Sequence, residues 1–316
     1  MIYRHLALLT ILAAFLLNSI SMQAQSHILF SRGAGQLNTG ETPDLMMYDV
    51  AKGTTQLIMK GSVRRRGEGN PAVSPDNKQI VFNTYRFSGW KLAIADYKEG
   101  KITNIRRFTN RPNYEYNASW SHDGKWITYQ EYNWGTDKGE IFIRNQTTGK
   151  ITKLNKSKAP GRTPSWTADD QKIVFNHQTG TNNDIYIADR NGSTIINISN
   201  HPAHDFAPSC SPKEQKLAFL SNKTGRLHLY TMDEDGKNRT DLTPDLASDT
   251  FVYDNWQNSA SWGYKTSWSP DGKQIVFNAL IDGDIELFIV NADGTGLKQI
   301  TDNNDADIAP HWAPKG

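Results

Sequence analysis

Short runs of alternating apolar and polar residues, separated by tight-turn signals, recur along most of this chain. A clear example is the segment 266–277, TSWSPDGKQIVF. Asp271-Gly272 is a turn dipeptide, because glycine accepts the positive φ that such turns need. Residues 274–277 then continue as a β-branched, apolar strand. The segment therefore predicts a strand, a tight turn and a second strand.

The same phrase occurs in six copies. At the position of its Trp the copies lie 47, 46, 44, 58 and 44 residues apart, at Val73, Trp120, Trp166, Cys210, Trp268 and Trp312. Two further strand signals, separated by a turn with glycine, follow each of the first five copies, as in ELFIVNADGTGLKQIT. A period near 45 that consists mostly of strands is typical of a four-stranded propeller blade.

The two ends of the chain complement each other. The last copy, APHWAPKG, ends where its second strand should begin, whereas the first strand signal, HILFSR from His27, has no inner strand before it. Joined across the termini, the two segments read like one copy of the phrase. We therefore predict an all-β fold over 25–316, a six-bladed β-propeller of four-stranded blades. The C-terminal inner strand joins the N-terminal blade and closes the ring, which leaves no open sheet edges.

The repeated phrase resembles the WD-like repeat of the TolB-type β-propellers. The segments HLYTMDEDGKNRTDLT and ELFIVNADGTGLKQIT match the second half of that repeat. The resemblance covers nearly all of the chain after its first residues, and it is limited to the propeller, without the N-terminal α/β domain of TolB. It implies a non-catalytic binding or scaffold protein, although related propellers also serve as lyases and as gatekeepers of peptidases.

Residues 1–24 have the composition of a signal peptide. A basic start at Arg4 and His5 precedes the apolar run 6–17, which is too short to span a membrane comfortably, and we expect cleavage after Ala24. An uncleaved anchor is the alternative. No cysteine follows the run, which argues against a lipid anchor. The prediction is a periplasmic or secreted protein, monomeric and without a transmembrane segment after cleavage.

Composition excludes several classes of function. The 35 basic and 33 acidic residues nearly balance, so charge gives no case for a nucleic-acid partner. Cys210 is the only cysteine, which excludes a disulfide framework and predicts a small buried apolar residue in an inner strand. The chain has no GxSxG, HExxH, CxxC or EF-hand pattern, so neither a peptidase nor a cofactor is predicted.

Arginine and aromatic residues gather in loops that a propeller places on one rim. These loops connect the second and third strands of a blade, or one blade to the next, and we call that side the long-loop rim. Apolar rings beside guanidinium groups suit stacking on a sugar or clasping a peptide. Packing over the blade cores is the alternative. The candidate ligand-binding residues are Arg64, Arg66, Arg86, Trp90, Tyr114, Tyr116, Trp134, Arg162, His177, His204, Asp205, Tyr253 and Trp256. The expected partner is a protein or an oligosaccharide, bound at this rim or at the mouth of the axial channel.

A competing function is a carbohydrate lyase. His177, His201 and His204 lie on neighbouring loops and could contribute imidazole ligands to a metal, although we favour ordinary polar loop residues. Oligogalacturonate lyases share this type of repeat and use a histidine-rich metal site. In a lyase, an Arg or a metal would neutralise the uronate carboxylate and a His or Tyr would act as the base. Arg64 to Arg66, Arg86, Arg162 and His177 are the candidates for these roles.

Overall fold

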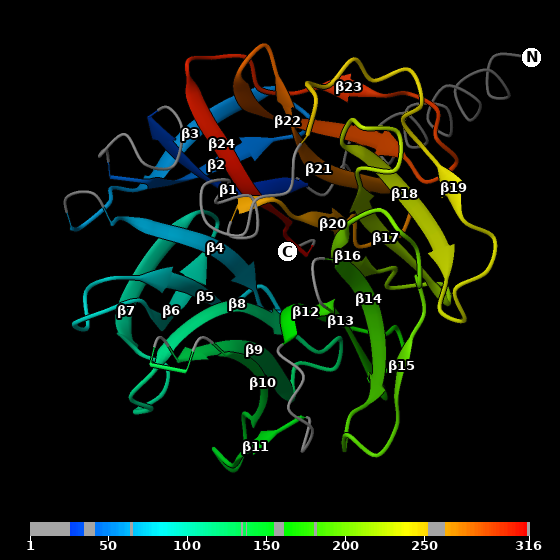
Figure 1. Ribbon diagram of the computed structural model, residues 1–316. Coiled ribbons are helices and arrows are strands. Elements are labelled where there is room, and N and C mark those ends of the chain that lie inside the picture. The colour runs from blue at the N-terminus through cyan, green and yellow to red at the C-terminus, as the bar shows by residue number, and fades with distance from the viewer. Residues whose placement is uncertain are drawn as a thin grey trace, which may run out of the picture.

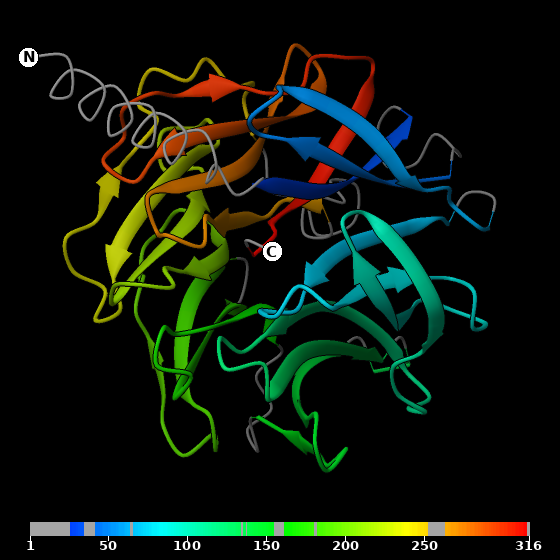
Figure 2. The same ribbon diagram turned by 180° about the vertical axis from the view of Figure 1, so that it is seen from behind.

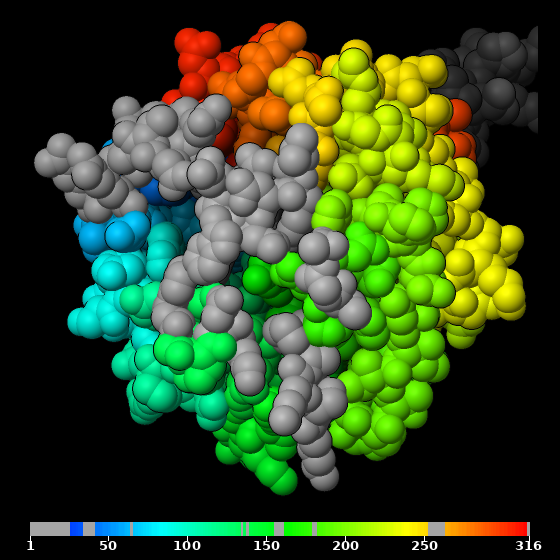
Figure 3. Space-filling model, in the orientation of Figure 1, coloured from blue at the N-terminus to red at the C-terminus, as the bar shows by residue number. Residues whose placement is uncertain are grey.

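The computed structural model describes residues 26–34, 42–63, 66–133, 135–136, 138–154, 161–179, 182–251 and 263–314. Over these residues the chain forms six sheets of four antiparallel strands, arranged as a ring (Figures 1 and 2). The blades follow one another around the ring in chain order (Figure 3). This confirms the six-bladed propeller. The signal peptide predicted for 1–24 lies outside the described residues, as does its cleavage site.

Within each blade the strands run in chain order from the axis of the ring outward, except that β24 forms the inner strand of blade 1. Blade 1 contains β24 (Asp305–Trp312), β1 (His27–Ala34), β2 (Asp44–Asp49) and β3 (Thr54–Met59). Blade 2 contains β4 (Glu68–Val73), β5 (Gln79–Thr84), β6 (Lys91–Lys98) and β7 (Lys101–Arg107). Blade 3 contains β8 (Tyr114–Trp120), β9 (Trp126–Asn133), β10 (Lys138–Asn145) and β11 (Ile151–Lys153). Blade 4 contains β12 (Gly161–Trp166), β13 (Lys172–Thr179), β14 (Asn182–Asp189) and β15 (Ile195–Asn197). Blade 5 contains β16 (Asp205–Cys210), β17 (Lys216–Ser221), β18 (His228–Asp233) and β19 (Thr240–Asp241). Blade 6 contains β20 (Thr266–Trp268), β21 (Gln274–Ile281), β22 (Asp284–Asn291) and β23 (Lys298–Gln299).

The two ends of the chain close the ring within blade 1. Strand β24 pairs antiparallel with β1, in a register that sets Trp312 opposite Ile28 and Asp307 opposite Arg32. The Arg32 guanidinium donates two hydrogen bonds to the Asp307 carboxylate, Nε to Oδ1 at 2.7 Å and Nη2 to Oδ2 at 2.6 Å. The predicted closure by a C-terminal inner strand is therefore confirmed, and a bidentate ion pair reinforces it.

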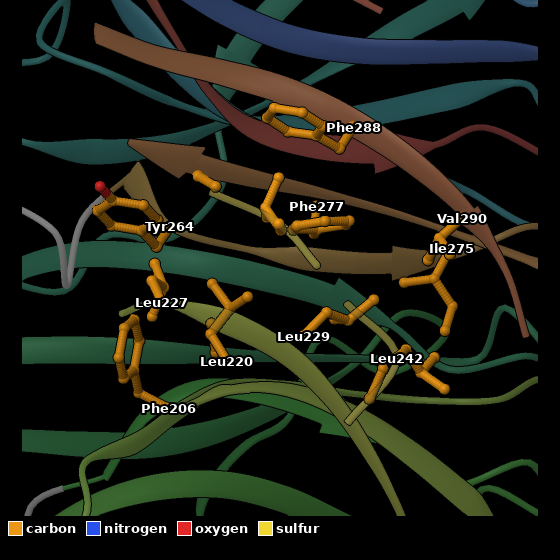
Figure 4. Packing of buried hydrophobic residues seen from close by; sticks show 14 of the residues in the cluster. Phe206, Leu220, Leu227, Leu229, Leu242, Tyr264, Ile275, Phe277, Phe288 and Val290 are labelled. Carbon is orange, nitrogen blue, oxygen red and sulfur yellow. The ribbon is translucent and has the colours of Figure 1, made fainter. Parts of the chain in front are cut away.

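Over the described residues the hydrophobic core is divided into six clusters, and each cluster lies between two consecutive blades. Figure 4 shows the cluster between blades 5 and 6, where Leu220 and Leu229 face Phe277 across the interface. The alternation along each strand explains this arrangement, because successive side chains point to opposite faces of a sheet and each blade has a neighbour on both faces. Burial of apolar surface thus holds the blades to one another.

In blades 3, 4 and 6 the repeated Trp joins the blade to the preceding one. Its indole Nε1 donates to a backbone carbonyl of the previous inner strand, from Trp120 to Ala72 at 3.1 Å, from Trp166 to Ser119 at 3.2 Å and from Trp268 to Ser209 at 3.0 Å. Cys210 occupies the same repeat position in blade 5, where it is buried in the cluster between blades 4 and 5. The repeated aromatic position is therefore structural, as the shared spacing indicates.

Five of the six inner strands contain a β-bulge three residues before this repeat position. The bulged residue adopts a positive φ between 46° and 53° in each case, at Asn70, Asn117, Thr163, Ala207 and Ala309. Strand β20 of blade 6 pairs in regular register instead, and Lys265 stands at the equivalent position. A bulge re-aims side chains locally, so blade 6 presents a different side chain to the axis of the ring.

Candidate functional site

Among the described residues, four aromatic rings pack together on the long-loop rim where blades 2 and 3 meet. Tyr85 and Trp90 come from the β5–β6 connection, whereas Tyr114 and Tyr116 begin β8. The ring centroids of Tyr85 and Trp90 lie 5.7 Å apart, those of Trp90 and Tyr116 6.3 Å, and those of Tyr114 and Tyr116 6.4 Å. These separations are in the range of favourable edge-to-face packing. The structure thus brings Trp90, Tyr114 and Tyr116 together.

Two further contacts fix this aromatic cluster. Gly89 adopts φ +118°, and a Cβ atom there would lie 2.7 Å from Cε1 of Tyr114, so only glycine allows the loop to approach the ring this closely. The Arg66 guanidinium lies 5.4 Å from the centroid of the Tyr85 ring, within the range of a cation–π contact. Arg66 reaches the cluster from the connection between blades 1 and 2. Three separate loops therefore build one surface.

The members of the cluster differ in burial, so some can contact a ligand and others only support the rings above them. Tyr116 is 3% exposed, and burial, followed by the neighbouring Tyr114 and Tyr132 hydroxyls, raises its pKa well above the ordinary value. Trp90, Tyr114 and Tyr85 are only partly buried, and Arg66 is exposed. The outer part of the cluster can therefore contact a ligand through flat apolar rings and through a guanidinium group, two kinds of side chain typical of binding surfaces. Tyr116 lies beneath these rings and supports them.

Arg86 points to a different partner, the buried carboxylate of Glu68. Its Nε donates to Oε1 of Glu68 at 3.0 Å, and the Ser62 hydroxyl donates to the same oxygen at 2.5 Å. The Glu68 side chain is fully buried, so removal of Arg86 would leave an uncompensated buried charge. The first role of Arg86 in this structure is to neutralise Glu68.

Glu68 belongs to a layer of buried acids that the sequence reasoning did not detect. Four inner strands carry an acid five residues before the repeat Trp position, and all four side chains are fully buried: Glu68, Glu115, Asp205 and Asp307. Asp205, a candidate ligand-binding residue, accepts a hydrogen bond from Nη2 of Arg239 at 2.5 Å. The repeated offset was the signal that could have revealed this layer, since a common position implies a common packing role.

The candidate histidines lie around blades 4 and 5. His177 packs edge-to-face against Tyr186 with a centroid distance of 5.1 Å, and Nδ1 of His201 accepts from the Ala203 amide at 3.0 Å. Burial lowers the pKa of His204, which favours its neutral form. Across the described part of the chain, no three side chains of His, Cys, Asp or Glu are arranged to hold a metal ion.

Arg162 and His177 lie on adjacent strands of blade 4 but face opposite sides of the sheet. Arg162 is opposite Asn176 in the β12–β13 register, whereas His177 is opposite Gly161. Because paired residues share a face and neighbours in a strand alternate, the guanidinium and the imidazole project in different directions. The arrangement does not bring these two candidates into one pocket.

The remaining candidates are Arg64, Trp134, Tyr253 and Trp256, which lie outside the described residues. The insertion before blade 6 is described up to Phe251 and again from Gly263. Phe251 stacks on Phe206 at 5.6 Å and meets Tyr264 edge-to-face at 5.6 Å, so both insertion aromatics that can be placed contribute to the core between blades 5 and 6. Tyr264 and Phe206 are visible in Figure 4.

Comparison with known proteins agrees with this geometry. A family model described as the TolB beta propeller domain matches residues 86–261. The chain belongs to the TolB β-propeller family. Its curated relatives include the Tol-Pal system protein TolB of Francisella tularensis subsp. mediasiatica (strain FSC147), which is 26% identical over 242 residues, or 75% of this chain and 52% of that protein. The chain thus spans about half the length of this relative.

Two solved structures illustrate the range of proteins that share this fold. TolB from Acinetobacter baumannii superimposes with a TM-score of 0.70 at 18% identity, covering 92% of this chain and 67% of that one. An oligogalacturonate lyase from Vibrio parahaemolyticus superimposes with a TM-score of 0.54 at 10% identity, covering 85% of this chain and 78% of that one. At such identities the likeness concerns the fold alone. Among the described residues of this TolB-like propeller, no helix has the length and apolar character needed to cross a membrane.

Proposed function

We propose that this TolB-like propeller is an exported, non-catalytic binding protein that holds a protein or glycan ligand on its long-loop rim. The observation that carries the proposal is the aromatic cluster between blades 2 and 3. Trp90 and Tyr114 present partly exposed rings there, and Arg66 adds a positive charge beside Tyr85. Aromatic and arginine side chains dominate the binding energy of many recognition surfaces.

Membership of the TolB family supports a binding role over a catalytic one. The curated relatives are named as Tol-Pal system proteins, which favours a protein partner in an exported compartment. The described rim also favours binding over a lyase reaction. Arg86 is bound to Glu68, and Arg162 and His177 face opposite sides of blade 4, so these lyase candidates are not gathered in one site. We propose a monomeric protein that acts in the periplasm or outside the cell.

The test has to separate the two rims of the propeller. A peptide array and a glycan array on residues 25–316 identify a binding probe, whose affinity is then measured for Trp90→Ala and for Trp126→Ala. Trp126 is a matched control, because it begins β9 directly after a tight turn on the opposite rim and, like Trp90, is partly buried. The Arg190 guanidinium lies 5.0 Å from its ring.

We expect Trp90→Ala to weaken binding about tenfold or more, as truncation of a central interface aromatic does, and Trp126→Ala to leave it within about twofold. Loss of affinity in Trp126→Ala alone would place the site on the rim of the tight turns and contradict the proposal. Incubation with oligogalacturonate, followed by the ultraviolet absorbance of unsaturated products, tests catalysis. Turnover by the wild type would contradict the binding role and favour the lyase.

A further inference from the structure

A cavity lies on the axis of the propeller, among the inner strands of all six blades. Its volume is about 460 Å³, within the range of small-molecule sites, and it extends to the prolines that precede the tight turns, such as Pro212 and Pro270. The basic side chains along its wall are Lys213, Lys265, His122 and His311. Among the described residues that line it there is no Asp or Glu.

Lys265 is the residue that breaks the sixfold pattern of this wall. The equivalent position in the other five blades is uncharged, with Asn70, Asn117, Thr163, Ala207 and Ala309, and three of these residues, Asn117, Thr163 and Ala207, line the cavity together with Lys265. A lysine that is partly buried within a ring of neutral residues loses hydration and gains no carboxylate in return. Burial is the only influence that shifts its pKa, which falls to about 8, so no acid compensates the ammonium.

The neighbouring layer of the wall offers hydrogen-bond donors. In three blades the side chain just before the repeat position accepts a backbone N–H from the next blade: His311 from Val73 at 3.0 Å, Ser165 from Cys210 at 3.3 Å, and Ser267 from Trp312 at 3.0 Å. With its acceptor site engaged, each of these groups keeps a proton to donate, the hydroxyl of a serine or Nδ1–H of the histidine.

His311 contributes to this pattern as a neutral donor. Burial, followed by the positive charge of Lys265, lowers the pKa of His311 to about 3, so the imidazole is uncharged at neutral pH. Because Nε2 accepts from the Val73 amide, the single proton resides on Nδ1. The wall thus combines one uncompensated ammonium with several oriented donors, which is the complement of an oxyanion.

We propose that the axial cavity binds a small oxyanion, with Lys265 as its counter-ion and Ser165, Ser267 and His311 as hydrogen-bond donors. The ligand is phosphate itself or the carboxylate of a small organic acid. This site is separate from the aromatic cluster, which lies on the long-loop rim between blades 2 and 3.

The experiment is a calorimetric titration of the folded protein with inorganic phosphate and, separately, with succinate, at ionic strength matched with choline chloride. The two arms distinguish the two sources of the oxyanion. We compare the wild type with Lys265→Met, which keeps the length of the side chain without its charge, and with Lys265→Arg, which keeps the charge. Lys213→Met is the matched control, since Lys213 lines the same cavity near its prolines.

At pH 7 we expect at least one of the two anions to bind to the wild type. Lys265→Met should weaken the affinity for this anion about tenfold or more, whereas the affinities of Lys265→Arg and Lys213→Met should stay within about threefold of that of the wild type. Succinate keeps its charge between pH 7 and 9, so its affinity should fall about tenfold over that range as Lys265 loses its proton. Equal affinity in Lys265→Met, a loss caused by Lys213→Met alone, or no binding of either anion below about 10 mM would each overturn the proposal.

Discussion

The ion pair that closes the ring allows a quantitative test of how the termini stabilise the propeller. Arg32 and Asp307 lie 275 positions apart in the chain, and their contact joins β1 to β24. The Asp307 side chain is fully buried and that of Arg32 is 23% exposed. Removing one partner of a buried pair costs about 3–5 kcal/mol, because the remaining charge loses its compensation. We expect Arg32→Met to lower the unfolding free energy by about 3 kcal/mol, the lower end of that range, since Arg32 keeps some contact with water.

The pH dependence of that loss identifies its cause. Burial raises the pKa of Asp307 although Arg32 opposes the shift, so removing Arg32 raises the pKa further. The unfolded carboxyl ionises near 3.9. Between that value and the folded pKa the folded state binds more protons than the unfolded state, so the unfolding free energy decreases as pH rises through this window. The deficit of Arg32→Met relative to the wild type should therefore be smaller at pH 5 than at pH 8.

Urea unfolding followed by tryptophan fluorescence measures the deficit, and hydrogen exchange locates it. Arg239→Met is the matched control, because it removes the cation from Asp205, another fully buried acid, but within blade 5. Amides of β1 and β24 should exchange faster in Arg32→Met, and amides of blade 5 in Arg239→Met. A deficit below about 1 kcal/mol, the value of an exposed pair, or one that is equal at both pH values would refute the reasoning.

Two further predictions concern the repeat and the axial lysine. Trp166 is 1% exposed, so Trp166→Ala should lower the unfolding free energy by about 3–5 kcal/mol. Trp166→Phe should cost less, because the phenyl ring keeps most of the packing and only the hydrogen bond to the Ser119 carbonyl is lost. Both should leave the affinity of the folded protein for the ligand of the long-loop rim unchanged, and a selective loss of that binding with normal melting would contradict a structural role. The pKa of Lys265 is about 8 in the folded protein and about 10.4 in the unfolded chain, so the unfolded state binds more protons between these two pH values. The unfolding free energy of the wild type should therefore rise over this range, relative to that of Lys265→Met, by at most about 3 kcal/mol. Parallel pH profiles for the two proteins would show that Lys265 is not buried as described.

The sequence by itself determined the architecture. A strand, a tight turn and a strand recur in six copies at a period near 45. The period predicts four strands in each blade, and the number of copies predicts six blades. The complementary ends, HILFSR and APHWAPKG, predict the closing pair of β1 and β24. These features are local or periodic, so they can be recognised without knowing which residues meet in space. The shared position of Trp120, Trp166, Trp268 and Trp312 predicts a packing role for the same reason.

Only the tertiary structure decided which loops form one surface and which charges are satisfied. Arg66, Tyr85, Trp90 and Tyr114 meet because blades 1, 2 and 3 pack side by side, and their spacing along the chain carries no such information. Arg86 belongs to the same loop as Trp90, yet its partner is a buried acid rather than the surface of the rim. Lys265 looks like any polar loop residue until the ring places it on the axis without a carboxylate, because burial and charge compensation depend on neighbours from all six blades.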